Sequence, residues 1–377
     1  MIMKSIASSI ILLLSLATLS SCHDQPTPGS RKIYINSEYG NLKEVIVGLA
    51  SGKNPSIDAP WYKEAIKILP QDERDIAEAT AGYNWTDIKY DDQGKYDPTG
   101  TISEAQRIDS ENNELIAVFE SLGVTVYRPD LITEEWVIEN YGEAALINGY
   151  SQDFPRDNLA IIGNNVIELT LKTPLRRFDI IGFNHLLTTK CDESVVWVSM
   201  PQIPLLPVPS DETPALEGGD VMVLGKTILV GNTANKAVGS NEAGYKWLKN
   251  YLGDDYKVIR VPLVETILHL DCALSIPKEG LAIICKDAFS DGIPEALNGW
   301  DFIEVSLEEA SRLAVNGLPV NDKNYIMSYN KHTEVTSDRI KSALESHGIT
   351  VHKVFFGAHN GQGGSIRCAT QAILRDK

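Results

Sequence analysis

The sequence contains few cysteines and lacks the cysteine spacings that are typical of metal sites. Five of the 377 residues are cysteine, and no two of them stand in a CxxC pattern. Neither a zinc site nor a disulfide framework is therefore indicated. Cys22 stands apart near the N-terminus, and an even number of cysteines follows it: Cys191, Cys272, Cys285 and Cys368. In an exported protein these four could still pair with one another.

Positive charge is also scarce. The chain has 34 Lys and Arg against 51 Asp and Glu, which gives a net charge of −17, and no basic patch stands out. We therefore expect no nucleic-acid partner, and small cations should be attracted more readily than anions. With 43% hydrophobic residues, the chain can bury a large core, in one big domain or two ordinary ones.

Long apolar runs are rare, and the run at residues 6–19 is too short for a stable membrane span. It is typical of a secretory signal. The following Leu19-Ser20-Ser21-Cys22 resembles the lipobox of bacterial lipoproteins; the alternative is an ordinary signal with a chance cysteine. We expect residues 1–21 to be a signal peptide, Cys22 to be lipidated and residues 22–32 to form a tether. The protein would then be exported and anchored to a membrane, at the periplasm or cell surface, only through lipid.

A repeated pattern follows the tether. Apolar runs interrupted by a tight polar turn predict four β-hairpins, at residues 159–169, 221–231, 274–285 and 318–328. Helical spacing that passes through glycine into a β-rich run occurs at residues 111–129, 241–262, 293–306 and 337–354, and less clearly at 183–200.

A fifth hairpin is split between the two ends of the chain. Its strands are residues 42–48 and a strand from Gly364 onward. Five ββαβ-like units of about 50 to 60 residues predict a closed ring of modules that share a core. We expect residues 33–377 to form one domain, in which residues 51–108 fit the period least and form a lid or surface loops.

Polar residues stand just ahead of the predicted hairpins. They are found in "FPRD" (154–157), "EGGD" (217–220), "HLD" (269–271) and "NG" (316–317), and Cys368 holds the matching place in the closing unit. Equivalent positions in a ring converge on its axis, so one central pocket should receive Asp157, Glu217, His269, Asp271 and Cys368. Taken singly, Asp157 and Asp220 could be turn or cap residues, His269 a core histidine, and Cys368 packing.

Together these residues predict a specific chemistry. Carboxylates bind a planar guanidinium well, and a thiolate beside a histidine is a nucleophile whose histidine can protonate a leaving amine. We expect Arg367 and His269 to favour the Cys368 thiolate, and Gly363 and Gly364 to let the strand approach the pocket. The remaining histidines are interpreted as structural or solvated: His185, His332, His347, His352 and His359.

From about Ile33 to the C-terminus, the ordered motifs resemble the guanidino-group modifying enzymes, whose fold is the five-bladed α/β propeller. These motifs are "SEYGNLKEVIVG", "FPRD", "EGGDVMVLG", "HLD" and "GGSIRCATQ". The segment "YSQDFPRDNLAIIGNNVIE" is similar to amidinotransferases such as glycine amidinotransferase. "EGGD" and "RC" are similar to arginine deiminases, and "CATQ" to agmatine deiminases.

The resemblance implies a role for each residue. Cys368 would be the nucleophile, His269 the general acid/base, Glu217 the acid paired with it, and Asp157 and Asp271 the guanidinium clamps. Further substrate contacts are expected from Asp220, Arg156, Asn316 and Arg367. An amidino-cysteine would pass its group to an amine acceptor or to water, with no metal and no organic cofactor.

Three functions remain open at this stage: an amidinotransferase, a guanidino deiminase or hydrolase, and a lipoprotein that only binds guanidino compounds. Binding alone would not need the cysteine and the histidine. The chain also departs from the amidinotransferase pattern, because Ala288 and Ala314 replace a carboxylate-binding arginine and a serine. Lys286 is one candidate to substitute for that arginine.

Overall fold

A computed structural model describes residues 32–376. The predicted signal peptide and Cys22 lie outside the described residues, as does all of the predicted tether except Lys32. Within residues 32–376, none of the helices combines the length and the apolar character that a membrane crossing requires.

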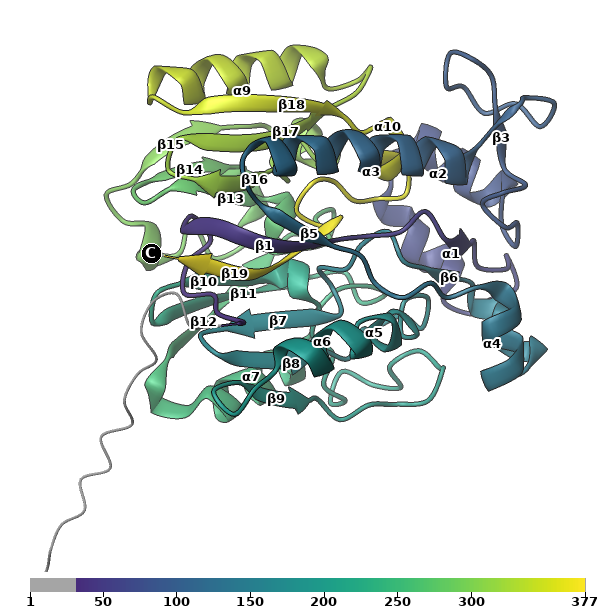
Figure 1. The fold of residues 1–377 in the computed structure, drawn as a ribbon, viewed down its shortest axis with the longest axis horizontal. Helices are drawn as coiled ribbons and strands as arrows, with labels where there is room; N and C mark the ends of the chain where they lie inside the picture. The colour runs from purple at the N-terminus through teal and green to yellow at the C-terminus, as the bar shows by residue number, and fades with distance from the viewer. Residues whose placement is uncertain (1–31, 377) are drawn as a thin grey trace, which may run out of the picture.

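Five three-stranded sheets form the body of the protein (Figure 1). In each sheet an antiparallel hairpin is followed by a third strand that runs parallel to the second. Four sheets are continuous in sequence: β7 (Leu159–Ile162), β8 (Asn165–Glu168) and β9 (Val196–Ser199); β10 (Val221–Leu224), β11 (Thr227–Thr233) and β12 (Lys257–Leu263); β13 (Leu274–Lys278), β14 (Leu281–Ile284) and β15 (Asp301–Glu304); β16 (Leu318–Asn321), β17 (Asn324–Tyr329) and β18 (Thr350–Phe355).

The fifth sheet joins the two ends of the described chain. β19 (Thr370–Asp376) runs antiparallel to β1 (Asn41–Val47), and β5 (Thr125–Tyr127) runs parallel to β1. Contacts between sheets join β13 to β16, β16 to β1 and β19 to β7. The closed ring of modules predicted from the repeats, and the five-bladed α/β propeller that the resemblance implied, are therefore confirmed.

The closing strand begins later than the sequence pattern predicts. Residues from Gly364 to Ala369 do not form a strand, because the Ala369 amide donates to the Ser365 carbonyl at 2.8 Å and the Thr370 hydroxyl donates to the Ile366 carbonyl at 2.8 Å. These local bonds form a tight turn. Cys368 consequently lies in a turn ahead of β19.

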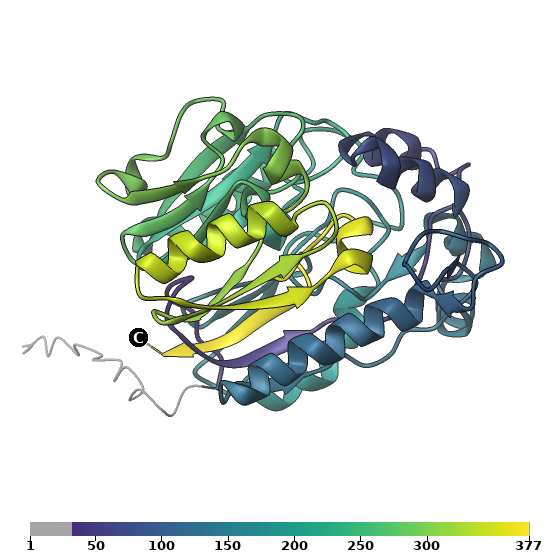
Figure 2. The same ribbon diagram turned by 90° about the horizontal axis from the view of Figure 1, so that it is seen from above.

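Helices cover the outer faces of the sheets (Figures 1 and 2). α3 (Glu104–Ser121) contacts β5 and β18, α7 (Glu242–Leu252) contacts β11 and β12, and α9 (Glu334–Ser346) contacts β17 and β18. Ser103 and Gln106 form a capping box at the start of α3, which is worth about 1 kcal/mol. α5 (Asp179–Gly182) and α6 (Asn184–Lys190) belong to the β7–β9 module.

The prediction of an α-helix within residues 293–306 is wrong. Only the 3₁₀ helix η7 (Glu295–Leu297) forms there. Pro294 precedes it, and Gly299 adopts a φ of 81° two residues after its end, so too few residues remain for an α-helix.

Residues 51–108 cover one end of the ring, opposite the end that carries the C-terminus (Figure 2). They form α1 (Tyr62–Ala65), η1 (Ile66–Ile68), α2 (Gln71–Ala79) and the short strands β2 (Gly52–Lys53), β3 (Lys89–Tyr90) and β4 (Ile102–Ser103). Their apolar side chains pack in two small clusters around Trp61 and Trp85, which also include Val238 and Ala358 from the rest of the domain. The last residues of this stretch, from Glu104, already belong to α3.

The remaining elements connect the modules. They are α4 (Glu134–Tyr141), η2 (Glu143–Asn148), β6 (Tyr150–Ser151), η3 (Gly218–Asp220), η4 (Gly253–Asp255), η5 (Leu270–Cys272), η6 (Lys286–Ala288), α8 (Leu307–Ser311) and α10 (Gly357–Gly361). Two of these short helices, η3 and η5, stand directly ahead of a hairpin and carry predicted site residues.

Candidate active site

A cavity of 590 Å³ lies between the ring and residues 51–108. Three of the predicted site residues line it, namely Asp157, Glu217 and Cys368. His269 and Asp271 do not line the cavity, but each contacts a residue that does. The structure therefore gathers at one place the five residues that the hairpin positions were expected to bring together.

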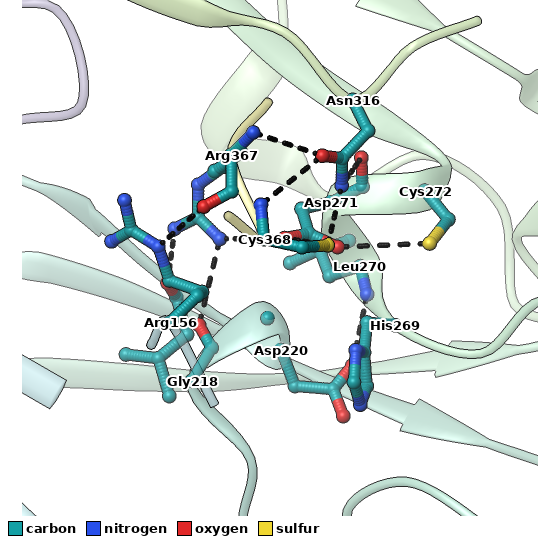
Figure 3. A network of polar contacts seen from close by, with 12 residues as sticks. Arg156, Gly218, Asp220, His269, Leu270, Asp271, Cys272, Asn316, Arg367 and Cys368 are labelled. Atoms are coloured by element: carbon teal, nitrogen blue, oxygen red, sulfur yellow. Dashed lines mark hydrogen bonds and ion pairs between the residues drawn. The ribbon is translucent and has the colours of Figure 1, made fainter. Parts of the chain in front are cut away.

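Cys368 is held in its turn by Asn316 and Asp271 (Figure 3). The Asn316 amide donates to the Cys368 Sγ at 3.2 Å, and its Oδ1 accepts from the backbone amides of Arg367 and Cys368. The Cys368 thiol lies 3.7 Å from Asp271 Oδ2 and the residue is only 4% exposed. The sulfur is thus fixed at the edge of the cavity.

Glycines allow the close approach of the segments that carry these groups. A Cβ at Gly364 would lie 2.4 Å from the ring of Phe154, and a Cβ at Gly219 would lie 2.5 Å from the His269 ring. No side chain fits at either position. Gly364 is therefore needed for packing, although it stands ahead of the turn that carries Cys368 and not in a strand.

His269 is buried and forms a short hydrogen bond. Its Nε2 lies 2.6 Å from Glu217 Oε2, and its Nδ1 lies 3.7 Å from Asp157 Oδ1. Burial by itself would lower the pKa of His269, but the carboxylates of Asp157, Asp220 and Glu217 outweigh it and raise the pKa to about 10. The imidazole therefore carries a proton at neutral pH and can act as an acid.

Two carboxylates on the cavity wall are kept ionised. Burial would raise the pKa of Glu217, but its hydrogen bond to His269 and the charge there lower it. The pKa of Asp157 is likewise lowered, against burial, by the positive charges of Arg176 and His269. Backbone amides complete the two sites: Lys172 donates to Glu217 at 2.9 Å, and Gly219 donates to Asp157 at 3.1 Å.

Arg367 and Arg156 lie on the side of Cys368 away from His269 and Cys272 (Figure 3), and neither lines the cavity. Arg367 pairs with Glu38 at 3.2 Å and with Asp271 at 3.0 Å. The Nε of Arg156 donates to the Arg367 carbonyl at 3.2 Å, and burial together with the charge of Arg367 lowers its pKa to about 9. Their placement differs from the substrate contacts predicted for them, because neither lines the cavity and Glu38 and Asp271 occupy the guanidinium of Arg367.

The ion pairs of Arg367 with Glu38 and Asp271 also affect the protonation state of the Cys368 thiol. Burial, together with the negative charges of Asp271 and Asp157, raises the pKa of Cys368 well above its usual value. The expectation that Arg367 and His269 favour the thiolate is therefore wrong for the ligand-free protein. The charge of Arg367 is balanced by Glu38 and Asp271, and two carboxylates face the sulfur.

Asp220 holds the His269 segment in place and does not line the cavity. Its two oxygens accept from the backbone amides of Leu270 at 2.9 Å and Ser240 at 3.1 Å. Burial raises the pKa of Asp220 to about 6. The substrate contact predicted for Asp220 is therefore not what this geometry offers, and its position resembles the turn-residue alternative.

The structure does not place Lys286 where it could substitute for the missing carboxylate-binding arginine. It pairs with Glu304 at 2.5 Å, is exposed and does not line the cavity. Ala288 and Ala314, the two departures noted in the sequence, are buried and also lie outside the cavity wall.

Sequence reasoning missed three residues of this region: Arg176, Glu38 and Cys272. Arg176 pairs with Asp157 at 2.5 Å, and Cys272 lines the cavity with its thiol 3.7 Å from Asp271 Oδ1. Glu38 stands within the motif "SEYGNLKEVIVG", so the motif itself was a signal for it. Arg176 follows the hairpin at residues 159–169. The polar residues that were expected to form the site all stand ahead of a hairpin.

The four cysteines of the described region are unpaired: Cys191, Cys272, Cys285 and Cys368. Nor do residues 32–376 contain a group of three or more His, Cys, Asp and Glu side chains arranged to hold a metal ion.

Residues 152–375 match the family model described as "N,N dimethylarginine dimethylhydrolase, eukaryotic". The chain belongs to this family. It therefore belongs to the superfamily of amidinotransferases and dimethylarginine hydrolases, which share the pentein fold, the five-bladed α/β propeller described above.

Curated relatives align over nearly the whole chain. An L-arginine:L-lysine amidinotransferase from Pseudomonas savastanoi pv. phaseolicola is 26% identical, with 90% of this chain and 93% of the relative covered. Inosamine-phosphate amidinotransferase 1 from Streptomyces griseus is 23% identical, with 91% and 97% covered.

Solved structures share the fold. The inosamine-phosphate amidinotransferase StrB1 from Streptomyces griseus superposes with a TM-score of 0.69 at 20% identity, covering 92% of this chain and 97% of that one. DDAH from Pseudomonas aeruginosa gives a TM-score of 0.55 at 16% identity, with 89% and 100% covered. An enzyme of the amidinotransferase or C–N hydrolase type is the class that fits all these relatives.

Proposed function

We propose that this protein modifies a guanidino compound through a covalent amidino-cysteine on Cys368, and that it acts as an amidinotransferase. The observation that carries the proposal is the arrangement of the site. A thiol and two ionised carboxylates line one cavity, and a protonated histidine lies directly behind one of those carboxylates. This set can bind a planar cation and also attack it.

The first step begins with binding. A guanidinium that binds Asp157 on the cavity wall adds positive charge beside a sulfur that also lies 3.7 Å from Asp271, which is itself paired with Arg367 outside the cavity wall. That charge lowers the pKa of Cys368, so the thiol releases its proton to solvent when the substrate binds, and the resulting thiolate attacks the substrate. The sulfur bonds to the guanidinium carbon, the bond from this carbon to the leaving nitrogen breaks, and His269 donates a proton to the departing amine. The product is an S-amidino-cysteine.

The second step reverses the proton transfer. His269, now neutral, accepts a proton from an incoming nucleophile, which attacks the amidino carbon and displaces the thiolate. If that nucleophile is an amine, a new guanidino compound forms. If it is water, the amidino group leaves as urea or, from a substrate cleaved at its terminal nitrogen, as a ureido product.

The similarity to amidinotransferases over about nine-tenths of the chain favours an amine as acceptor. The match to the dimethylarginine hydrolase family keeps hydrolysis as the second candidate. The two reactions share every step up to the amidino-cysteine, so they differ only in which molecule reaches it. The enclosed volume of 590 Å³ leaves room for an acceptor beside the donor.

The test is mass spectrometry after incubation with a panel of guanidino compounds, in the presence and absence of amines. We expect an adduct on the peptide that contains Cys368, and amidinated amine as the released product. Release of ureido compounds or ammonia at the same rate with and without amines would favour the hydrolase. Binding without any adduct or product would favour the third possibility, a binding protein.

We also propose that the enzyme is an exported lipoprotein anchored through Cys22. This part rests on the apolar run at residues 6–19 and the lipobox-like Leu19-Ser20-Ser21-Cys22 alone. A guanidino substrate would then be met outside the cytoplasm.

A further inference from the structure

Asn316 is a predicted substrate contact that the structure places elsewhere. The residue is buried, with 1% of its surface exposed, and it does not line the cavity. It stands just ahead of β16, and its side chain points toward Arg367 and Cys368 (Figure 3). An effect of Asn316 on the reaction therefore has to act through the protein and not through a contact with the substrate.

The orientation of the Asn316 side-chain amide follows from its partners. The amide oxygen accepts the backbone amides of Arg367 at 3.0 Å and Cys368 at 3.3 Å. An NH₂ group cannot take that place, because it would direct two further donors at these two donors. The amide nitrogen is therefore the atom that lies 3.2 Å from the Cys368 sulfur and 3.2 Å from the Asp271 carbonyl oxygen.

These four hydrogen bonds use the whole capacity of the amide. A primary amide has two N–H donors and two lone pairs on its oxygen. One donor goes to the Asp271 carbonyl and the other to the sulfur, while both lone pairs accept backbone amides. Asn316 cannot turn away from the sulfur without breaking several buried hydrogen bonds, each of which is costly to lose. Its donor is thus a fixed feature of the site.

This donor opposes most of the other groups around the sulfur. Burial and the carboxylates of Asp271 and Asp157 raise the pKa of the thiol, and the charge of Arg367 on the same turn is balanced by its own ion pairs. Hydrogen bonds from the Ser365 backbone and the Asn316 side chain act in the opposite direction and lower this pKa. An N–H group binds a thiolate more strongly than a thiol, because the negative charge strengthens the hydrogen bond.

The turn that leads to Asn316 is strained. Leu313 has a φ of 65°, and within residues 32–376 it is the one non-glycine residue with a positive φ. Its carbonyl accepts the Asn316 backbone amide at 3.1 Å, so the strained turn is the segment that sets the position of Asn316. Backbone strain of this kind persists where the surrounding structure requires it and is common at functional sites. The strain therefore supports a functional role for Asn316.

We propose that Asn316 is a catalytic residue that stabilises the Cys368 thiolate through its side-chain N–H. In the first step this donor stabilises the sulfur after its proton has left. In the second step it stabilises the thiolate that the incoming nucleophile displaces. The inference rests on the proposed function, since the reaction needs a thiolate only if Cys368 is the nucleophile.

The experiment measures how fast iodoacetamide alkylates Cys368 in the ligand-free protein across the neutral and alkaline range, by mass spectrometry of the peptide. Asn316→Asp keeps an oxygen for the two backbone amides but presents a second oxygen to the sulfur. We expect the pH midpoint of alkylation to rise by about one unit or more. At neutral pH the rate should fall about threefold or more, because the smaller thiolate fraction outweighs the higher nucleophilicity of a more basic thiolate.

Asn330→Asp is the matched control. The Asn330 side-chain oxygen also accepts two backbone amides, but its nitrogen donates to the Asn360 side chain at 2.8 Å and not to a sulfur. This variant should leave the alkylation of Cys368 unchanged. Asn316→Ala removes the donor without adding a carboxyl group and should also slow alkylation, so the test does not depend on the folding of Asn316→Asp.

Turnover provides a second measurement. Because Asn316 lies outside the cavity wall, Asn316→Asp should lower kcat about tenfold and leave KM within about twofold of its original value. A residue that merely held the turn would tolerate this substitution, since the aspartate can still accept the backbone amides of Arg367 and Cys368.

The outcomes separate this inference from the proposed function. If Cys368→Ser keeps its turnover, the proposed function and the role of Asn316 both fall. If Cys368→Ser is inactive, but the folded Asn316 variants are alkylated as fast as the original protein and keep its kcat, only the role of Asn316 is overturned. Asn316 would then be a structural residue that holds the turn of Cys368.

Discussion

Two buried histidine–glutamate pairs lie in different parts of the molecule. In the first, His269 Nε2 lies 2.6 Å from Glu217; in the second, His359 Nδ1 lies 2.8 Å from Glu111. Both histidines are almost inaccessible, and in each the other ring nitrogen has no hydrogen-bond partner within residues 32–376. By burial and pairing alone the two are nearly alike.

Their surroundings differ. Asp157 and Asp220 add negative charge around His269, and Glu217 opens onto the cavity. The His359 ring stacks on Phe356 at 4.0 Å, and Glu111 accepts the backbone amides of Ala358 and His359, which ties α3 to α10. A buried histidine–carboxylate pair is thus insufficient evidence of acid–base chemistry. Additional carboxylates and a cavity with a thiol distinguish the first pair.

The largest loss of turnover should come from substitution of Cys368, the proposed nucleophile near the first histidine–glutamate pair. Cys368→Ser keeps the shape but replaces the nucleophile by a poor one, so turnover should fall by about three orders of magnitude or more. Cys272→Ser is a demanding control, because that thiol lines the same cavity beside Asp271; Cys191→Ser and Cys285→Ser are simpler ones. All three should keep their activity. Alkylation that a guanidino ligand blocks at Cys272, with Cys368 unreactive, would contradict the assignment.

The comparison itself is tested by the matched variants His269→Gln and His359→Gln. Loss of His269 removes the proton donor, and we expect turnover to fall by about 10² to 10⁴ with the fold retained. Loss of His359 leaves Glu111 without one partner, so thermal and chemical unfolding should show a loss of about 1–3 kcal/mol in stability. Similar losses of turnover at equal amounts of folded protein would show that the two pairs do not differ in function.

Asp157 adds negative charge beside His269, and Asp271 lies 3.7 Å from the Cys368 thiol. Asp157→Asn or Asp271→Asn removes a charged partner whose hydrogen bonds are worth about 1.5–3 kcal/mol each. The affinity for a guanidino ligand should therefore fall more than tenfold, as titration calorimetry can measure. Unchanged affinity at both positions would assign them to the turns in which they stand.

The pH dependence of turnover tests whether His269, and not His359, supplies the proton. Turnover requires the proton on His269, whose pKa is raised to about 10, so the rate should decline as the pH rises through that value. Glu217→Gln removes a negative charge that stabilises the imidazolium. The pKa of His269 then falls, and the alkaline limb should move to lower pH by about one unit or more. Rate–pH profiles of this variant and of Glu111→Gln, which should not move the limb, provide the check.

The smallest effect on catalysis is expected from Cys22→Ala. The lipidation prediction concerns the location of the protein, so neither histidine pair should change in this variant. Fractionation should find the protein released from the membrane with its turnover intact. Persistent membrane association would refute the lipobox interpretation.

The sequence by itself determined the five modules and their order. A hairpin can be predicted locally, because apolar runs flank a polar turn. The equivalence of the modules then predicted that the polar residues ahead of the hairpins would come together: Asp157, Glu217, His269, Asp271 and Cys368. Local pattern was less reliable where it was short: Pro294 and Gly299 prevent the expected helix, and side-chain and backbone hydrogen bonds delay the last strand to Thr370.

Only the tertiary structure decided which polar groups face the cavity and which face one another. Arg367 was expected at the substrate and instead pairs with Glu38, a residue 329 positions away in the chain. Arg176 was not considered, yet it lies on Asp157. The charge state of the Cys368 thiol follows from these pairings and from burial. Ion pairs and desolvation depend on distances between remote segments, which no periodicity in the sequence encodes.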